Sequence, residues 1–170
     1  MEFLKKIENI LPENRVFVDE TGVNDNIVVQ YGWAGKGKRS YAEQSGHKTE
    51  RLSIVAAYVH GTKKLIAPFE FSGHTDTALF VGWFKHVLCP ALKPGQTVIL
   101  DNASFHKSAE LYDLAENIGC QVLFLPPYSP DMNPIEKVWA NFKRKLRALI
   151  KKAEDFKSGI TEAMQKSLPG

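Results

Sequence analysis

The sequence has little cysteine and no long apolar run. Cys89 and Cys120 are the only cysteines, both in apolar surroundings, which indicates core thiols in a reducing compartment and excludes a disulfide scaffold. No apolar run approaches the roughly 20 residues that cross a bilayer. Residues 1–6 lack the apolar stretch of a secretory signal. These absences predict a cytoplasmic protein.

Internal repeats, low-complexity segments and linkers are absent too, so residues 1–170 are expected to form one domain. The 5 histidines have no ligand spacing, which argues against a zinc site. Neither a Ser-His-Asp nor a Cys-His signature is present. Any catalysis is therefore expected to proceed without a covalent enzyme intermediate.

The net charge of +3 is too small to indicate a nucleic-acid partner by itself. The distribution of charge is more informative, because basic residues cluster in a glycine-rich turn and in a predicted helix. Such clusters are candidates for contact with DNA phosphates, although a solvated helix face and a polar loop explain them equally well. The candidates are Lys36, Lys38 and Arg39 in the turn, and Lys143, Arg144 and Arg147 in the helix.

Compact apolar runs predict strands, and apolar residues at helical spacing predict helices. The first three strands are expected to pair antiparallel, and a right-handed crossover then places the next strand parallel to the first. This order predicts a ribonuclease H-like α/β fold, a mixed five-stranded sheet flanked by helices. The predicted strands are 15–19, 26–33, 51–60, 97–101 and 121–125, with a short one near 65–71, and the helices are 2–10, 75–88, 107–118 and 134–152.

Two apolar strands of the same pattern each end in an acid, Asp19 and Asp101. If these strands are neighbours, their carboxylates meet at one edge of the sheet. Glu136 lies in the first turn of the last long helix and is expected to point to the same edge. Three carboxylates can hold two divalent ions about 3.5–4 Å apart, an arrangement that serves in-line displacement at phosphorus.

Each acid also has an ordinary structural explanation. Asp19 and Asp101 are each compatible with a turn at the end of a strand. Glu136 follows Asn133 and Pro134, so it is compatible with a capping box in which Asn133 is the N-cap. The three acids together, on two strands and the following helix, favour the catalytic interpretation.

Three sequence blocks resemble the DDE catalytic domain of mariner-type transposases, most closely the bacterial insertion-sequence branch. They are Val-Asp-Glu-Thr-Gly at 18–22, Leu-Asp-Asn-Ala-Ser-Phe-His-Lys-Ser at 100–108 and Leu-Pro-Pro-Tyr-Ser-Pro-Asp-Met-Asn-Pro-Ile-Glu-Lys-Val-Trp at 125–139. The third block is highly specific. The resemblance covers nearly the whole chain.

The resemblance implies a transposase that excises a mobile element at its ends and inserts it into target DNA, typically at TA. It implies two Mg²⁺ or Mn²⁺ ions on Asp19, Asp101 and Glu136, a homodimer in the active complex and a bacterial, nucleoid-associated location. Glu at the third position agrees with the bacterial branch. His106, five residues after Asp101, is a further candidate for a DNA contact.

The resemblance also implies an N-terminal helix-turn-helix region that reads the element ends. Only about fourteen residues precede the first predicted strand, so this region is expected to be absent here. Two other functions remain open: another ribonuclease H-like nuclease, which would share the fold and the metals, and a non-catalytic DNA-binding remnant of a decayed element.

Overall fold

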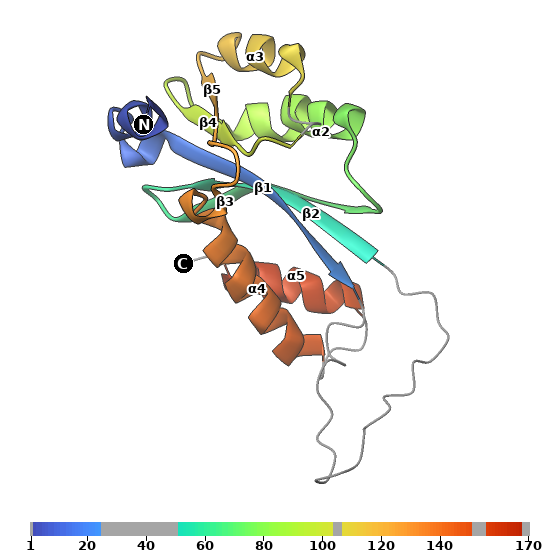
Figure 1. Cartoon of the computed structure of the whole chain (residues 1–170). Helices are drawn as coiled ribbons and strands as arrows, with labels where there is room; N and C mark the ends of the chain where they lie inside the picture. Colours follow the sequence, from blue (N-terminus) through green and yellow to red (C-terminus); the bar gives the residue numbers. More distant parts are fainter. Residues whose placement is uncertain (1, 25–50, 104–106, 151–155, 168–170) are drawn as a thin grey trace.

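The computed structural model describes residues 2–24, 51–103, 107–150 and 156–167. Its centre is a mixed five-stranded sheet of order β3-β2-β1-β4-β5 (Figure 1). β1 pairs antiparallel with β2 and parallel with β4, so it lies at the centre of the sheet. The strands are β1 (Arg15–Asn24), β2 (Arg51–Val59), β3 (Lys64–Ser72), β4 (Thr97–Leu100) and β5 (Gln121–Phe124).

The sheet confirms the predicted fold class, although single strands differ from their predictions. The predicted strand 26–33 lies outside the described residues. The third antiparallel strand is instead β3, for which only a short strand at 65–71 was predicted. β1 does not end at Asp19 but continues to Asn24, because its second half pairs with β2.

The main helices are α1 (Glu2–Glu8), α2 (Thr77–Trp83), α3 (Ala109–Glu116), α4 (Ile135–Ile150) and α5 (Phe156–Ser167). The carboxylate of Asp76 caps α2 by accepting a hydrogen bond of 2.8 Å from the Leu79 N–H. The predicted helix 75–88 is divided, since a π-helical turn (Phe84–Leu88) and a 3₁₀ turn (Cys89–Ala91) follow α2. No helix in the described ranges is long and apolar enough to cross a membrane.

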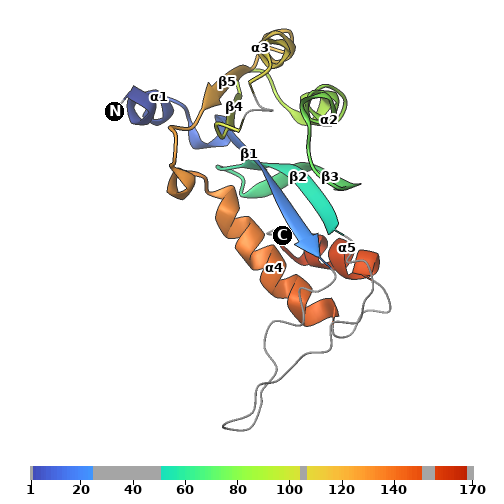
Figure 2. The same cartoon turned by 45° about the vertical axis from the view of Figure 1, so that its right-hand side comes forward.

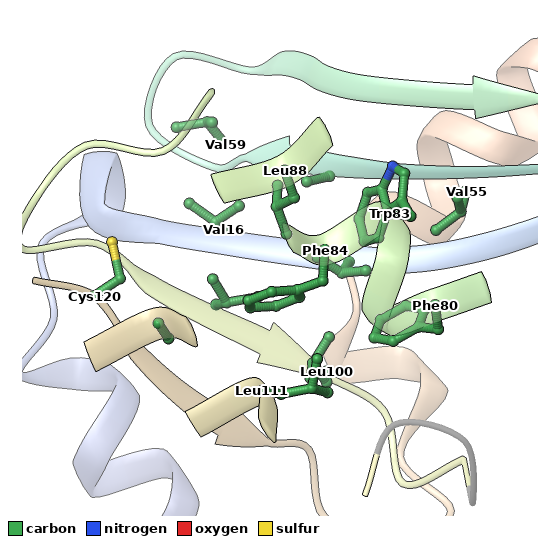
Figure 3. Close-up of a cluster of buried hydrophobic side chains, with 14 residues drawn as sticks. Val16, Val55, Val59, Phe80, Trp83, Phe84, Leu88, Leu100, Leu111 and Cys120 are labelled. Atoms are coloured by element: carbon green, nitrogen blue, oxygen red, sulfur yellow. The ribbon is translucent and has the colours of Figure 1, made fainter. Parts of the chain in front are cut away.

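Side chains of the central strands alternate between two apolar cores, one on each face of the sheet. Val16, Val18, Val98 and Leu100 belong to the first core, which the α2 segment and α3 cover (Figures 1 and 3). In this core Phe80, Trp83, Phe84 and Leu88 pack on the sheet, and Cys120 is buried as a free thiol, as predicted.

The second core lies between the opposite face of the sheet and α4 with α5 (Figure 2). Phe17 and Ile99 face this side. The residues of α4 that pack here recur at three- and four-residue spacing, which fixes the helix against the sheet. They are Ile135, Trp139, Phe142 and Leu146.

Gly61, which follows β2, has no room for a side chain. A Cβ there would lie 2.5 Å from the backbone nitrogen and 2.7 Å from the Cα of Glu13. The Gly61 N–H donates to Pro12 O at 2.9 Å, so the two segments cannot separate without losing this bond. We expect Gly61→Ala to lower the free energy of unfolding by about 1–3 kcal/mol in urea denaturation.

Gly82 in α2 is the matched control, since a Cβ there would meet no atom within 4 Å. Gly82→Ala is expected to raise the free energy of unfolding by about 0.5–1 kcal/mol, because alanine favours the helix. Equal effects of the two substitutions would contradict the close approach at Gly61.

Candidate active site

Asp19 lies within β1, and Asp101 directly follows β4, the parallel neighbour of β1. The parallel pairing of β1 with β4 runs from Arg15 opposite Thr97 to Phe17 opposite Ile99. Asp19 and Asp101 each follow two residues after that last pair, so they stand at equivalent positions beyond the end of the ladder. The prediction that the two strands are neighbours is confirmed.

Alternation along the strands sets the face on which these acids lie. Phe17 and Ile99 point into the core under α4, and residues two positions apart in a strand share a face. Asp19 and Asp101 therefore also face α4. Glu136 comes from the first turn of that helix, as predicted.

The three acids line one pocket of about 230 Å³. Asp19 and Asp101 are half-buried and Glu136 is exposed. The other side chains come from the segments that follow β4 and β5: Asn102, Ala103, Leu125, Pro126, Tyr128, Ser129, Pro130 and Asn133. The arrangement brings the predicted acids from three separate elements to one cavity.

Burial and like charge act together on Asp19. Desolvation, followed by the negative charges of Glu136 and Asp101, raises the pKa of Asp19 from 3.8 to about 7, against the lowering effects of the Glu20 backbone and of Trp139. Asp101 is oriented by its own loop, since its Oδ1 accepts a hydrogen bond of 3.0 Å from the Ala103 N–H. The pocket therefore carries negative charge that costs stability unless a proton or cation compensates it.

Two buried polar atoms at the site make no hydrogen bond, Trp139 Nε1 and Asn133 Oδ1. The Trp139 indole nevertheless lies near enough to Asp19 to favour its charged form. Asn133 is 5% exposed and lines the pocket. Because its Oδ1 accepts nothing, it does not cap α4, and the capping box considered for Asn133 and Glu136 is not formed.

The carboxylates do not form a ready-made metal centre. Among the residues that the structure describes, no group of three His, Cys, Asp or Glu side chains is close enough to hold a metal ion. The donor set nevertheless suits Mg²⁺ or Mn²⁺, which prefer carboxylate oxygens. Burial and, after it, the like charges of the pocket raise the pKa of Asp19, and a divalent cation would compensate the negative charge that they disfavour.

The predicted DNA-contacting residues are placed only in part. Lys143 and Arg147 lie seven and eleven positions after Glu136 on α4 and hence on its side of the helix. Arg144 is exposed and donates to Asn141 Oδ1 at 2.8 Å. The other four, Lys36, Lys38, Arg39 and His106, lie outside the described residues.

A sequence profile described as DDE superfamily endonuclease matches residues 14–157. The chain belongs to this family. It is also 28% identical, over 139 residues, to the insertion element IS630 uncharacterized 39 kDa protein of Shigella sonnei. That match covers 79% of this chain and 39% of the relative, so the chain spans well under half of the relative's length.

Solved structures share the fold of this DDE domain. The Mos1 transposase paired-end complex with left transposon end superposes with a TM-score of 0.62 at 16% identity, covering 98% of this chain and 57% of that one. The catalytic core domain of BIV integrase gives 0.53 at 12% identity, covering 89% and 81%. These likenesses confirm the ribonuclease H-like fold. With the family match and the IS630 relative, they confirm the resemblance to mariner-type and bacterial insertion-sequence transposases.

Two residues that line the pocket, Asn133 and Tyr128, and Trp139, which acts on Asp19, received no role of their own from the sequence. Trp139 was predicted only as part of the apolar face of α4, Asn133 only as a helix cap and Tyr128 only as part of a rigid loop. All three lie in the block at 125–139 that carries the resemblance. That block was the available signal, but residue types alone did not show which side chains face the acids.

Proposed function

We propose that this chain is the catalytic domain of a metal-dependent DNA transposase. It cleaves DNA strands at the ends of a mobile element and joins the resulting 3′-hydroxyl to target DNA. One observation carries the proposal: Asp19, Asp101 and Glu136, from two adjacent central strands and the returning helix, line one pocket.

The three carboxylates are the residues that would hold Mg²⁺ or Mn²⁺. When bound, two such ions supply charge stabilisation at the attacking and leaving oxygens of a phosphodiester. The protein's own part is to place the ligands. The middle of β1 carries Asp19, the residue after β4 is Asp101, α4 carries Glu136, and the Trp139 indole favours the charged form of Asp19.

Basic residues of α4 are proposed to hold the DNA backbone beside this pocket. Lys143 and Arg147 follow Glu136 along one side of the helix, away from its apolar stripe. DNA lying along this side would place its backbone next to the acids. A homodimer acting on two element ends, insertion at TA and association with the bacterial nucleoid belong to the same proposal.

Nicking of supercoiled plasmid by the purified chain tests the proposed activity. We expect nicking that requires Mn²⁺ or Mg²⁺ and stops with a chelator, with little cleavage of an RNA–DNA hybrid. Preference for the hybrid would favour another ribonuclease H-like nuclease. Absence of Mn²⁺ binding in titration calorimetry would favour the non-catalytic remnant.

The proposed DNA contact predicts a change in salt dependence. Lys143→Ala and Arg147→Ala are each expected to weaken duplex binding, because each loses a phosphate contact. Each should also reduce the slope of log K against log salt by about 0.9. The measurement is fluorescence anisotropy between 50 and roughly 200 mM salt.

Lys85→Ala is the control for this prediction. Lys85 is exposed in the π-helical turn on the opposite face of the sheet. Its loss is expected to leave the slope unchanged. A similar change in all three variants would indicate a general effect of net charge rather than a contact at α4.

A further inference from the structure

The ring of Tyr128 stands in solvent at the rim of the acidic pocket. Its exposure is 102%, the largest of any bulky hydrophobic residue in the described part of the chain. Tyr128 nevertheless lines the same pocket as Asp19, Asp101 and Glu136. Exposure of an aromatic ring to water is unfavourable, and this ring lies beside a polar pocket. Its surface is therefore available to a ligand that would cover it.

The backbone at Tyr128 adopts an unfavourable conformation. Tyr128 has φ of 56°, in the left-handed region that residues other than glycine, asparagine and aspartate rarely adopt. Such a conformation persists only where the surroundings impose it, and it occurs often at functional sites. Pro127 before it and Pro130 two positions after it restrict the loop further.

Hydrogen bonds fasten both ends of the loop. The Leu125 N–H donates to Leu100 O at 2.7 Å, and the Asn102 side chain donates to Leu125 O. On the other side, the Asn133 N–H donates to Pro130 O at 2.9 Å. The end of β4 and the turn before α4 therefore fix the backbone on both sides of Tyr128.

We propose that Tyr128 stacks on an unpaired base of the DNA strand next to the scissile phosphate. This inference rests on the proposed function. The acids of the pocket repel phosphate, so an uncharged contact is needed to hold a nucleotide at this end. An aromatic ring can supply it, because every base presents a π-face.

The geometry also narrows the class of substrate. Within a duplex both faces of each base are covered by neighbours, so the ring can stack beside the scissile phosphate only where a base is unpaired. We therefore expect the preferred DNA to have unpaired bases at the cleavage point. Stacking of one base is expected to strengthen binding by about 5- to 100-fold.

The test compares binding of two DNA duplexes that differ in one feature. One carries an unpaired 2-aminopurine at its end, and the other is fully paired. Tyr128→Asn removes the ring but tolerates the left-handed backbone, so it separates loss of stacking from loss of the loop. We call the duplex with the unpaired 2-aminopurine the open duplex. We expect Tyr128→Asn to weaken binding of the open duplex by about 5- to 100-fold and to abolish quenching of the 2-aminopurine.

Other variants complete the design. Tyr128→Phe should restore both affinity and quenching, since it retains the ring. Tyr112→Asn, which removes another exposed tyrosine outside the pocket, should have no effect. Affinity for Mn²⁺ should be the same in all four proteins, because Tyr128 contributes no ligand.

Two outcomes would overturn the inference. One is unchanged binding of the open duplex by Tyr128→Asn, and the other is equal weakening of both duplexes. If the wild type does not nick DNA with any metal, yet Tyr128→Asn selectively loses the open duplex, the stacking role stands and the proposed cleavage fails.

Discussion

Asp101→Asn is expected to reduce the initial rate of Mn²⁺-dependent plasmid nicking by about 10³ or more. The carboxylate lines the proposed metal-binding pocket, and asparagine keeps its shape while removing its charge. Metal ions contribute several kcal/mol of charge stabilisation in such reactions, and about 1.4 kcal/mol corresponds to a tenfold change in rate. The same preparation should melt as cooperatively as the wild type by circular dichroism.

Asp131→Asn is the matched control for this loss. Asp131 belongs to the 3₁₀ turn Pro130–Met132, is exposed and does not line the pocket. Its substitution should keep nicking within about twofold of the wild type, since surface changes of this kind have small effects. Nicking by Asp101→Asn at the wild-type rate would refute the assignment of the three acids.

Local patterns in the sequence predicted which elements carry the three acids. Short apolar runs before Asp19 and Asp101 indicate buried strands, and the spacing between apolar residues from Ile135 to Leu146 indicates one helical face. The composition of short runs and the spacing of apolar residues indicate strands and helices without any knowledge of distant contacts. The crossover rule then placed the two strands side by side.

What the sequence could not show depends on pairing between distant segments. Asp19 was predicted to end its strand, but β2 pairs with β1 as far as Asn24, and only the ladder with β4 stops earlier, at Phe17. The unpaired Oδ1 of Asn133 likewise depends on how α4 meets the loop. The left-handed backbone of Tyr128 depends on the hydrogen bonds that fasten that loop.

The same limit applies to the proposed metal site. The three acids could be named from sequence, yet they line a pocket without forming a cluster that could hold an ion, within the ranges described. Ligand identity follows from residue type. The distance between ligands depends on how three separate elements pack, and like charges in the pocket oppose their close approach.

Asp19→Asn is expected to stabilise the metal-free protein at neutral and higher pH while removing activity. The pKa of Asp19 is raised to about 7 in the folded chain, from 3.8. Between these values the folded state binds the proton more tightly than the unfolded state, so the free energy of unfolding falls as pH rises from about 4 to about 7. A shift of this size corresponds to at most about 4 kcal/mol, because each unit is worth about 1.4 kcal/mol.

The measurement is urea denaturation between pH 4 and 8, with chelator present. Asn cannot ionise, so the variant should lack this part of the pH slope and should exceed the wild type in stability by a few kcal/mol at pH 8. The two proteins should converge near pH 4, where Asp19 is protonated in the folded state. Asp131→Asn should follow the wild type at every pH.

Mn²⁺ should reverse the order of stability of the two proteins, so that the wild type becomes more stable than Asp19→Asn. At pH 8 the cation compensates the charge that destabilises the wild type, and binding to the folded state raises the melting temperature by mass action. Asp19→Asn has lost one proposed ligand and much of the repulsion, so its melting temperature should respond little. An equal response to Mn²⁺ in both proteins would show that Asp19 is not part of the binding site. If the variant is less stable than the wild type at pH 8 in chelator, then burial and like charge in the pocket do not raise the pKa of Asp19.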